Sequence, residues 1–311
     1  MIYLGLDIGG TKSAVLFGTE QGEILFREQI ATTTPKETLE TLFRIAKESG
    51  YQGCAAGISC GGPLDEQAGL ILSPPNLPGW DAVPITKMVE EAFGIPAYLC
   101  NDANACALAE NRFGAGKGTK NMIFCTFGTG MGAGLIINGK LFAGTNGNAG
   151  EIGHVRMEQT GPIGYGKEGS FEGFVSGGGL AQLGKMAAKQ CLAEGKTCGF
   201  CKDETELATI SAKTIALAAY AGDEVAQEVY RTCGKYLGRG LAIMIDVLNP
   251  ECIVLGSVFA RSGSLLIPAM EQELQKECLP EALKVVKIVP AALGEAIGDY
   301  GAIVTAMEGN S

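Results

Sequence analysis

The chain has 311 residues, 46% of them hydrophobic, so it can bury a large core and is long enough for two lobes. Its net charge of −10 argues against nucleic-acid binding, because neutralising phosphates needs a cluster of Lys and Arg that the sequence lacks. The first apolar run meets Asp7 too early for a signal peptide, and no stretch approaches the roughly 18 apolar residues of a membrane span. We therefore expect a cytoplasmic protein without a membrane partner.

The first predicted unit is a strand at 2–7, a glycine turn at 8–11 and a second strand at 13–18, followed by a strand at 23–30. A dinucleotide-binding unit would enter a helix after its glycines, whereas this chain returns as a strand. The glycines therefore do not open a Rossmann site.

The rest of the first half alternates helices and strands. The predicted elements are a helix at 36–49, a buried strand at 53–59, an ordered loop at 73–84, a helix at 85–93, a strand at 97–100 and an alanine-rich helix. Asn101 or Asp102 would cap this last helix, and the glycines at 114–118 would end it and form a candidate hinge.

The opening pattern recurs about 120 residues later, with a strand at 121–127, a glycine turn at 128–134 and a hairpin closed by Asn138 and Gly139. The repeat suggests a duplicated fold whose two turns face one cleft. The second half is mainly helical: it contains an amphipathic helix at 225–248, strands at 252–256 and 285–292, and an apolar last helix that should pack on the first lobe.

Each glycine turn could bind phosphate, because stacked backbone amides and a Thr hydroxyl form an anion site. Asp7 could hold Mg²⁺ through water, and Lys12 would add a positive charge. The alternative is a pair of ordinary tight hairpins. Gly256 ends a buried strand, where an adenine ring could lie against the backbone, or where the strand simply turns.

Asp102 follows a strand at the edge where open α/β sheets keep their ligands, so it could accept a proton from a substrate hydroxyl. It could equally be only a helix cap. His154, the chain's one histidine, follows Glu151 by three residues, and together with Glu172 they could hydrogen-bond a polyhydroxylated ligand such as a sugar. The alternatives are a structural histidine and a solvated helix start at Glu172.

Cys191, Cys198 and Cys201 lie within eleven residues, but no second pair or histidine follows them. Free thiols in a reducing compartment are the expected state, without a structural disulfide, and a metal site is the alternative.

These motifs stand in one order along almost the whole chain. "LGLDIGGTK", "PNLPGW", "NDANACALAE", "FGTGMGAGLIINGKL", "GNAGEIGH" and "NPECIVLG" resemble the ROK family of bacterial sugar kinases and sugar-responsive repressors. The resemblance implies an α/β, two-lobed actin-like ATPase (ribonuclease H-like) fold with a cleft between the lobes. We predict that residues 1–117 with 297–311 form the N-terminal lobe and that 118–296 form the C-terminal lobe.

The resemblance also implies roles for single residues. Asp102 would be the catalytic base, and the substrate would contact Gly62, Asn76, Asn101, Glu151, His154 and Glu172. The nucleotide would contact Asp7, Gly9, Gly10, Thr11, Lys12, Gly128, Thr129, Gly130, Gly132 and Gly256. ATP and Mg²⁺ are the implied cofactors, and a homodimer is the implied assembly.

One departure concerns zinc. Most family members follow the His with three cysteines that bind a structural zinc, whereas this chain has Tyr165 and Ser170 where two of them would stand. We therefore expect no structural zinc there and a loop held by packing through Tyr165 and Phe171. A glucokinase-like hexose kinase is the expected function. The alternatives are a kinase for fructose, mannose, allose or an N-acetylhexosamine (GlcNAc or ManNAc), and a non-catalytic sugar-binding regulator.

Overall fold

The structure is a computed structural model that describes residues 1–310. Its residue contacts divide the chain into two compact units. Unit 1 comprises residues 1–120, 134–149 and 292–311, and unit 2 comprises 121–133 and 150–291. The segment 134–149 thus groups with unit 1 by contacts, while the functional lobe boundaries given above stay a prediction. No helix within residues 1–310 is long and apolar enough to cross a membrane.

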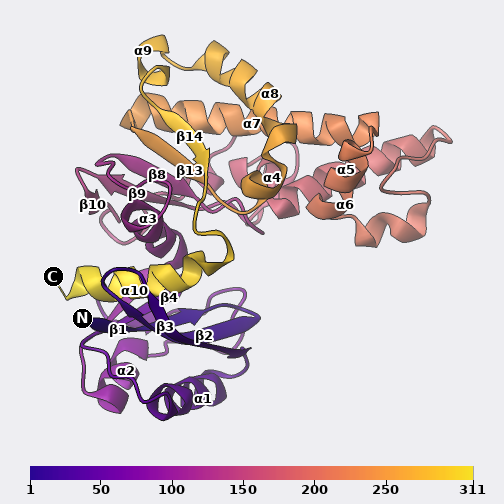
Figure 1. The fold of residues 1–311 in the computed structure, drawn as a ribbon. Coiled ribbons are helices and arrows are strands. Elements are labelled where there is room, and N and C mark those ends of the chain that lie inside the picture. Colours follow the sequence, from indigo (N-terminus) through magenta and orange to yellow (C-terminus); the bar gives the residue numbers. More distant parts are fainter. Residues whose placement is uncertain (311) are drawn as a thin grey trace. The chain divides into compact units, whose positions relative to one another are not determined.

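Unit 1 is built on a five-stranded sheet of order β3-β2-β1-β4-β7 (Figure 1). The first three strands are antiparallel, and β4 and β7 run parallel to β1. The elements of this unit are β1 (Ile2–Ile8), β2 (Lys12–Thr19), β3 (Ile24–Ala31), α1 (Pro35–Glu48), β4 (Ala56–Cys60), β5 (Leu64–Asp65), β6 (Leu70–Ile71), α2 (Ile85–Phe93), β7 (Ala97–Asn101), α3 (Asp102–Arg112), β9 (Ala133–Ile137, all but its first residue), β10 (Lys140–Leu141) and α10 (Ile297–Gly309).

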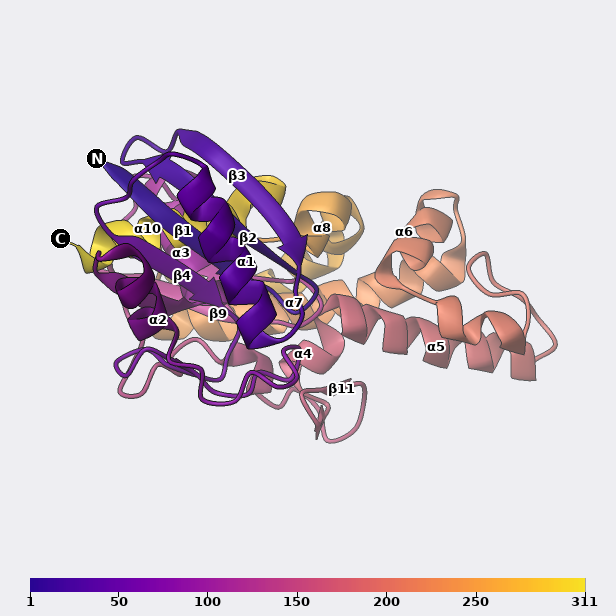
Figure 2. The same cartoon turned by 90° about the horizontal axis from the view of Figure 1, so that it is seen from below.

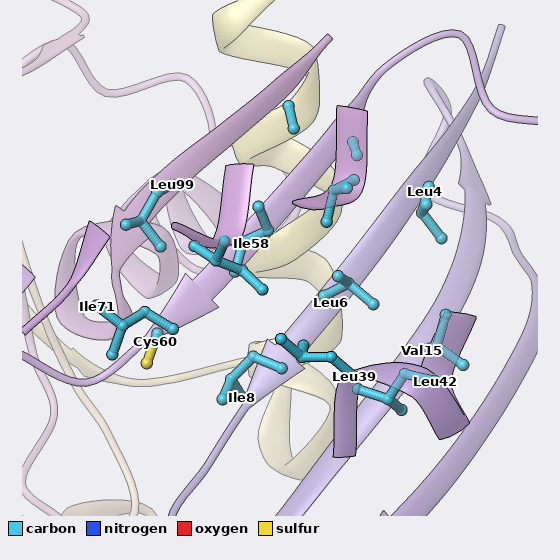
Figure 3. Packing of buried hydrophobic residues seen from close by; sticks show 14 of the residues in the cluster. Leu4, Leu6, Ile8, Val15, Leu39, Leu42, Ile58, Cys60, Ile71 and Leu99 are labelled. Carbon is cyan, nitrogen blue, oxygen red and sulfur yellow. The ribbon is translucent and has the colours of Figure 1, made fainter. Parts of the chain in front are cut away.

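The alternation of side chains along β1 decides what each face of this sheet does. Leu4, Leu6 and Ile8 point into a core that α1 closes with Leu39 and Leu42 (Figure 3). Helices α1 and α2 cover this face, which Figure 2 shows from their side. The odd-numbered residues of β1, Asp7 among them, therefore belong to the opposite face.

Helices α10 and α3 cover that opposite face. The approach of α10 is close because glycines lie beneath it: a methyl group added to Gly5 would lie 3.1 Å from Ala302 Cβ, and one on Gly57 would overlap the Ala302 carbonyl oxygen. The prediction that the last helix packs on the first sheet is confirmed.

Unit 2 contains three parallel strands in the order β8-β13-β14, paired in register from Met122 and Cys252 to Cys125 and Leu255. The rest of unit 2 is mainly helical, and its helices α5 and α6 lie side by side (Figure 2). The elements are β8 (Met122–Cys125), η1 (Ile152–His154), β11 (Ile163–Gly164), β12 (Lys167–Glu168), α4 (Phe171–Phe174), α5 (Gly177–Ala193), η2 (Glu204–Thr209), α6 (Ala212–Tyr220), α7 (Glu224–Leu248), β13 (Cys252–Leu255), α8 (Val258–Glu277), α9 (Pro280–Leu283) and β14 (Lys287–Pro290).

Candidate functional site

The first glycine turn joins β1 to β2 and is closed by a 3.1 Å hydrogen bond from the Gly9 N–H to the Lys12 carbonyl oxygen. The Gly9 carbonyl oxygen accepts a 2.6 Å hydrogen bond from the hydroxyl of Thr32, at the end of β3. A methyl group added to Gly10 would lie 2.9 Å from Asn76 Cβ. The predicted strand-turn-strand unit is confirmed, and it packs against the loop that carries Asn76.

Asp7 stands near the carboxyl end of β1 and faces the first turn of α10, where a methyl group on Gly298 would lie 2.5 Å from its Oδ2. Burial, followed by the charges of Asp299 and Asp102, raises the pKa of Asp7 to about 6, and Arg27 opposes this shift. The cause is electrostatic, because a carboxylate removed from water beside like charges is costly to ionise. A cation next to Asp7 would relieve that cost.

Asp102 is the first residue of α3, directly after β7. Asn101 is the helix N-cap, and its side chain accepts a 3.0 Å hydrogen bond from the Ala103 N–H. Asp102 Oδ1 accepts from the same N–H at 2.8 Å. The prediction of a cap at these positions is therefore confirmed. The other carboxylate oxygen, Oδ2, lies near Gly61, at 3.7 Å from where a methyl group on that residue would stand.

Asp102 has solvent-accessible surface, yet many protein atoms lie around its carboxylate. This burial raises its pKa above the usual aspartate value, and the backbone hydrogen bonds at the start of the helix act in the opposite direction. A carboxylate with a raised pKa is a better general base near neutral pH than an ordinary aspartate. The residue thus combines the cap with an environment suited to proton transfer.

Several predicted sugar contacts of unit 1 come together beside Asp102. A methyl group added to Gly61 would lie 3.8 Å from the Asn76 side-chain nitrogen, and one added to Gly62 would lie 3.5 Å from that of Asn101. Two amide side chains and one carboxylate thus lie near the backbone of two consecutive glycines, Gly61 and Gly62. This polar group can hydrogen-bond several hydroxyl groups of one ligand.

Glu66 was not identified from the sequence. Its Oε1 accepts a 2.8 Å hydrogen bond from the Asn101 N–H, and burial raises the pKa of Glu66. The residue follows β5, 35 positions away from its partner, so no local pattern indicates the contact. Its carboxylate supports the end of β7 immediately before Asp102.

In unit 2, the second glycine turn connects β8 to β9 and is closed at Thr126 and Gly132. The Thr126 N–H donates to the Gly132 carbonyl oxygen at 3.0 Å, and the Gly132 N–H donates to the Thr126 hydroxyl at 3.0 Å. The start of α5 supports the turn, because the Gly177 N–H donates to the Gly128 carbonyl oxygen at 2.8 Å. The second predicted strand-turn-strand unit is confirmed.

Gly256 lies beside this turn, at the carboxyl end of β13. Its N–H donates to the Cys125 carbonyl oxygen at 2.9 Å, and a methyl group on it would lie 2.6 Å from the Thr126 carbonyl oxygen. The Val258 N–H donates to the Phe127 carbonyl oxygen at 3.0 Å. The predicted adenosine segment and phosphate turn are therefore neighbours at the edge where open α/β sheets bind ligands.

His154 closes the 3₁₀-helix η1 and is exposed, and Glu151, also exposed, precedes that helix. The Tyr165 ring meets the imidazole edge-on, with centroids 5.0 Å apart. The Lys167 ammonium donates to the His154 carbonyl oxygen at 2.7 Å. Phe171 is fully buried and its N–H donates to the Val155 carbonyl oxygen at 2.8 Å, so this residue packs beneath the loop, whereas Tyr165 is 65% exposed.

Cys198 and Cys201 form an isolated antiparallel bridge, in which each N–H donates to the other carbonyl oxygen at 3.1 Å. Both side chains are buried, and burial raises both thiol pKa values. Across residues 1–310, no three His, Cys, Asp or Glu side chains are grouped so that they could hold a metal ion.

Comparison with known proteins places these features in a family. The sequence model of the ROK family matches residues 3–308. A glucokinase of Streptomyces coelicolor is 33% identical over 310 residues, covering 98% of this chain and 97% of its own. An N-acetylmannosamine kinase of Escherichia coli O9:H4 is 33% identical over 275 residues, covering 87% and 88%.

Among solved structures, a ROK family glucokinase from Streptomyces griseus in complex with glucose and AMPPNP matches with a TM-score of 0.79 and 31% identity, covering 99% of this chain and all of its own. The match of fold and sequence extends over both units, so it does not depend on one motif. The chain therefore belongs to the ROK family and has an α/β fold of the actin-like ATPase type.

Proposed function

We propose that this protein is an ATP-dependent sugar kinase that phosphorylates a hexose, with glucose as the first candidate and glucose 6-phosphate as the product. The observation that carries the proposal is the grouping of Asn76, Asn101 and Asp102 around Gly61 and Gly62 in a chain of the ROK family. A carboxylate beside several hydrogen-bonding groups suits a sugar whose one hydroxyl must lose a proton.

In the proposed reaction, Asp102 accepts the proton of the attacking sugar hydroxyl as its oxygen bonds to the γ-phosphorus of ATP and the bond to ADP breaks. Asn76, Asn101 and the backbone at Gly62 orient the sugar. Glu151, His154 and Glu172 of unit 2 are further proposed sugar ligands. Orientation matters because positioning and charge stabilisation supply most of the catalysis in phosphoryl transfer.

The proposed nucleotide contacts are the two glycine turns, at residues 9–12 and 128–132, and Gly256. Asp7 is the proposed support for Mg²⁺ through water, and its surroundings suit a cation because two further carboxylates already raise its pKa. When bound, Mg²⁺ neutralises phosphate charge. We further propose a cytoplasmic homodimer.

We propose glucose ahead of the other sugars because glucokinases of two Streptomyces species, one of them in complex with glucose, match almost the whole chain. The match to an N-acetylmannosamine kinase keeps N-acetylated sugars as competitors. ADP release should be measured over a panel containing glucose, fructose, mannose, allose, GlcNAc and ManNAc. If no sugar raises ADP release above the ATPase background, the kinase proposal is wrong.

The Asp102→Asn variant separates an enzyme from a regulator that only binds sugar. Turnover should fall roughly 10²–10⁴-fold, because the general base is lost, while sugar binding measured by calorimetry persists. Asp65→Asn, which changes an exposed carboxylate on β5, is the matched control and should keep full turnover. If the parent and Asp102→Asn both bind sugar and release ADP at the same rate, the protein is a regulator rather than a kinase.

A further inference from the structure

The segment 155–170 directly follows His154 and has little regular structure of its own. Its only strands, β11 and β12, are two residues long and form a small hairpin. Four glycines interrupt it, and it contains no cysteine. A backbone this poor in regular hydrogen bonds is positioned mainly by side-chain contacts with the elements around it.

Gln182 of α5 makes two such contacts with the Ile163 backbone, at 2.9 and 2.8 Å, and Glu158 makes the charged one. Its Oε1 accepts a 3.0 Å hydrogen bond from the Tyr236 hydroxyl and a 3.1 Å hydrogen bond from Arg239 Nη1, both on α7. Arg239 Nε donates in turn to Glu273 Oε1 on α8, at 2.7 Å. One guanidinium thus joins a loop carboxylate to a helix carboxylate, a geometry that lysine cannot reproduce.

Two of these groups, Arg239 and Glu273, are shielded from solvent, whereas the Glu158 side chain is 43% exposed. The side chains of Arg239 and Glu273 are 27% and 10% exposed, so the ion pair between them is far less screened than one on the surface. Burial and the Glu158 carboxylate raise the pKa of Tyr236 to about 12, so its hydroxyl keeps the proton that it donates.

The Tyr236 ring also makes contacts of its own. It stacks on Phe174 of α4 with centroids 3.7 Å apart, and the Arg239 guanidinium lies 5.3 Å from its centroid. Phe174 also reaches the loop, because a methyl group on Gly161 would lie 2.6 Å from its Cζ. The α7 anchor and the loop therefore share one packed contact.

The anchored part of the loop is coupled back to His154. The Glu158 N–H donates to the Gly169 carbonyl oxygen at 3.1 Å, which ties the two sides of the loop together. Lys167, at the hairpin between them, donates to the His154 carbonyl oxygen at 2.7 Å. Movement of Glu158 would therefore be passed to the backbone that carries the imidazole.

We propose that Glu158, Tyr236 and Arg239 are positioning residues that fix the 155–170 loop and, given the proposed sugar-kinase function, set the affinity for sugar through His154. None of the three is proposed to touch the reacting atoms. Their effect should therefore fall on the KM for sugar and leave kcat and the KM for ATP nearly unchanged.

The test uses the single histidine as a probe of its own loop. In Glu158→Gln and Tyr236→Phe, we expect the KM for the best sugar to rise about tenfold, since small displacements of binding groups are costly. Diethyl pyrocarbonate should modify His154 at least about threefold faster in both variants. Tyr236→Phe keeps the ring stack, so it remains informative if Glu158→Gln folds poorly.

The control is Glu228→Gln, which removes the partner of Arg231 on the exposed face of the same helix and should change neither readout. The double variant Glu158→Gln/Tyr236→Phe should be less impaired than the sum of the two single changes, because both remove one contact. Unchanged sugar KM and unchanged modification rates would overturn the proposal. Should the chain phosphorylate no sugar at all, the modification rate still decides whether the anchor fixes the loop.

Discussion

One carboxylate oxygen of Glu172 accepts a 2.9 Å hydrogen bond from the Met131 N–H, and the same oxygen would lie 2.6 Å from a methyl group added to Gly130. Glu172 is a proposed sugar ligand, whereas Met131 and Gly130 belong to the second phosphate turn. A single side chain therefore joins the group proposed to bind sugar with the turn proposed to bind nucleotide.

This relationship predicts different results for two substitutions at the same position. Glu172→Gln keeps an acceptor oxygen for Met131 but loses the charge, so the KM for sugar should rise about tenfold while the KM for ATP changes less than about twofold. Glu172→Ala removes the support of the turn as well, so both KM values should rise. Steady-state kinetics with each substrate varied will measure both. Equal effects of the two variants on ATP would show that the hydrogen bond does not support the turn.

Two glycine substitutions should separate folding from phosphate binding. Gly10→Ala places a methyl group against Asn76, so the free energy of unfolding should fall by about 1–3 kcal/mol. In Gly128→Ala, the new methyl group has no atom of residues 1–310 within 4 Å, so stability should be unchanged. If phosphates lie against the second turn, however, the KM for ATP should rise in Gly128→Ala. Denaturant unfolding and ATP titration measure the two effects, and an unaffected KM for ATP would argue against a phosphate there.

Asp7 should make stability depend on pH. The pKa of Asp7 is about 6 in the folded protein, against 3.8 for an ordinary aspartate, which we take for the unfolded chain. Between these two pH values the folded state therefore binds more protons than the unfolded state. Asp7 therefore lowers the free energy of unfolding as pH rises through this window, and the full penalty is present above pH 6. Asp7→Asn should be more stable than the parent by about 1–3 kcal/mol at pH 8, with the difference vanishing toward pH 4.

The measurement is urea unfolding of both proteins without nucleotide at several pH values. Glu40→Gln, on the exposed surface of α1, is the control and should change the free energy of unfolding only slightly. A difference for Asp7→Asn that is constant with pH would contradict the pKa assignment.

Metal removal should have two distinct outcomes. The loop 155–170 has no cysteine, and Ser170 is buried as the cap of α4, where its hydroxyl accepts a 3.1 Å hydrogen bond from the Gly173 N–H. We therefore expect that a zinc chelator leaves the melting temperature unchanged, while removal of Mg²⁺ abolishes turnover reversibly. Elemental analysis that finds about one zinc per chain would contradict the first outcome.

Turns and helix ends could be predicted from short sequence patterns, because one or two residues decide where they form. The hairpin after β9 turns at Asn138 and Gly139, both with positive φ, as the Asn-Gly pair requires. The cap of α3 follows from the side chains of Asn101 and Asp102, and α7 ends at Leu248 as predicted. Strand ends were less accurate: the predicted strand at 53–59 is β4 at Ala56–Cys60, because pairing with β1 and β7 sets its length.

Contacts between distant parts of the chain could not be predicted in this way. Arg27 and Asp299 form an ion pair across 272 positions, and Glu158 meets its partners on α7 about 80 positions later. Such pairs depend on which helix reaches which loop in the folded chain, and no periodicity encodes that. Asp7, Asp102 and Gly256 could be found because they stand at the ends of predicted strands, whereas Gly62 and Asn76 were implied only by the family resemblance. The residues that position the proposed ligands lie where the sequence carries no such signal.

The position of α10 has a consequence for biosynthesis. This helix covers the face of the first sheet that carries Asp7, but the ribosome makes it only after the whole of unit 2. During translation, the face that β1 and β4 present to α10 therefore stays uncovered until the residues of unit 2 have been made. The backbone at Gly5 and Gly57 is exposed on this face during that time. Chaperone capture of the nascent chain should thus concentrate on the first hundred residues, and release should coincide with the arrival of α10.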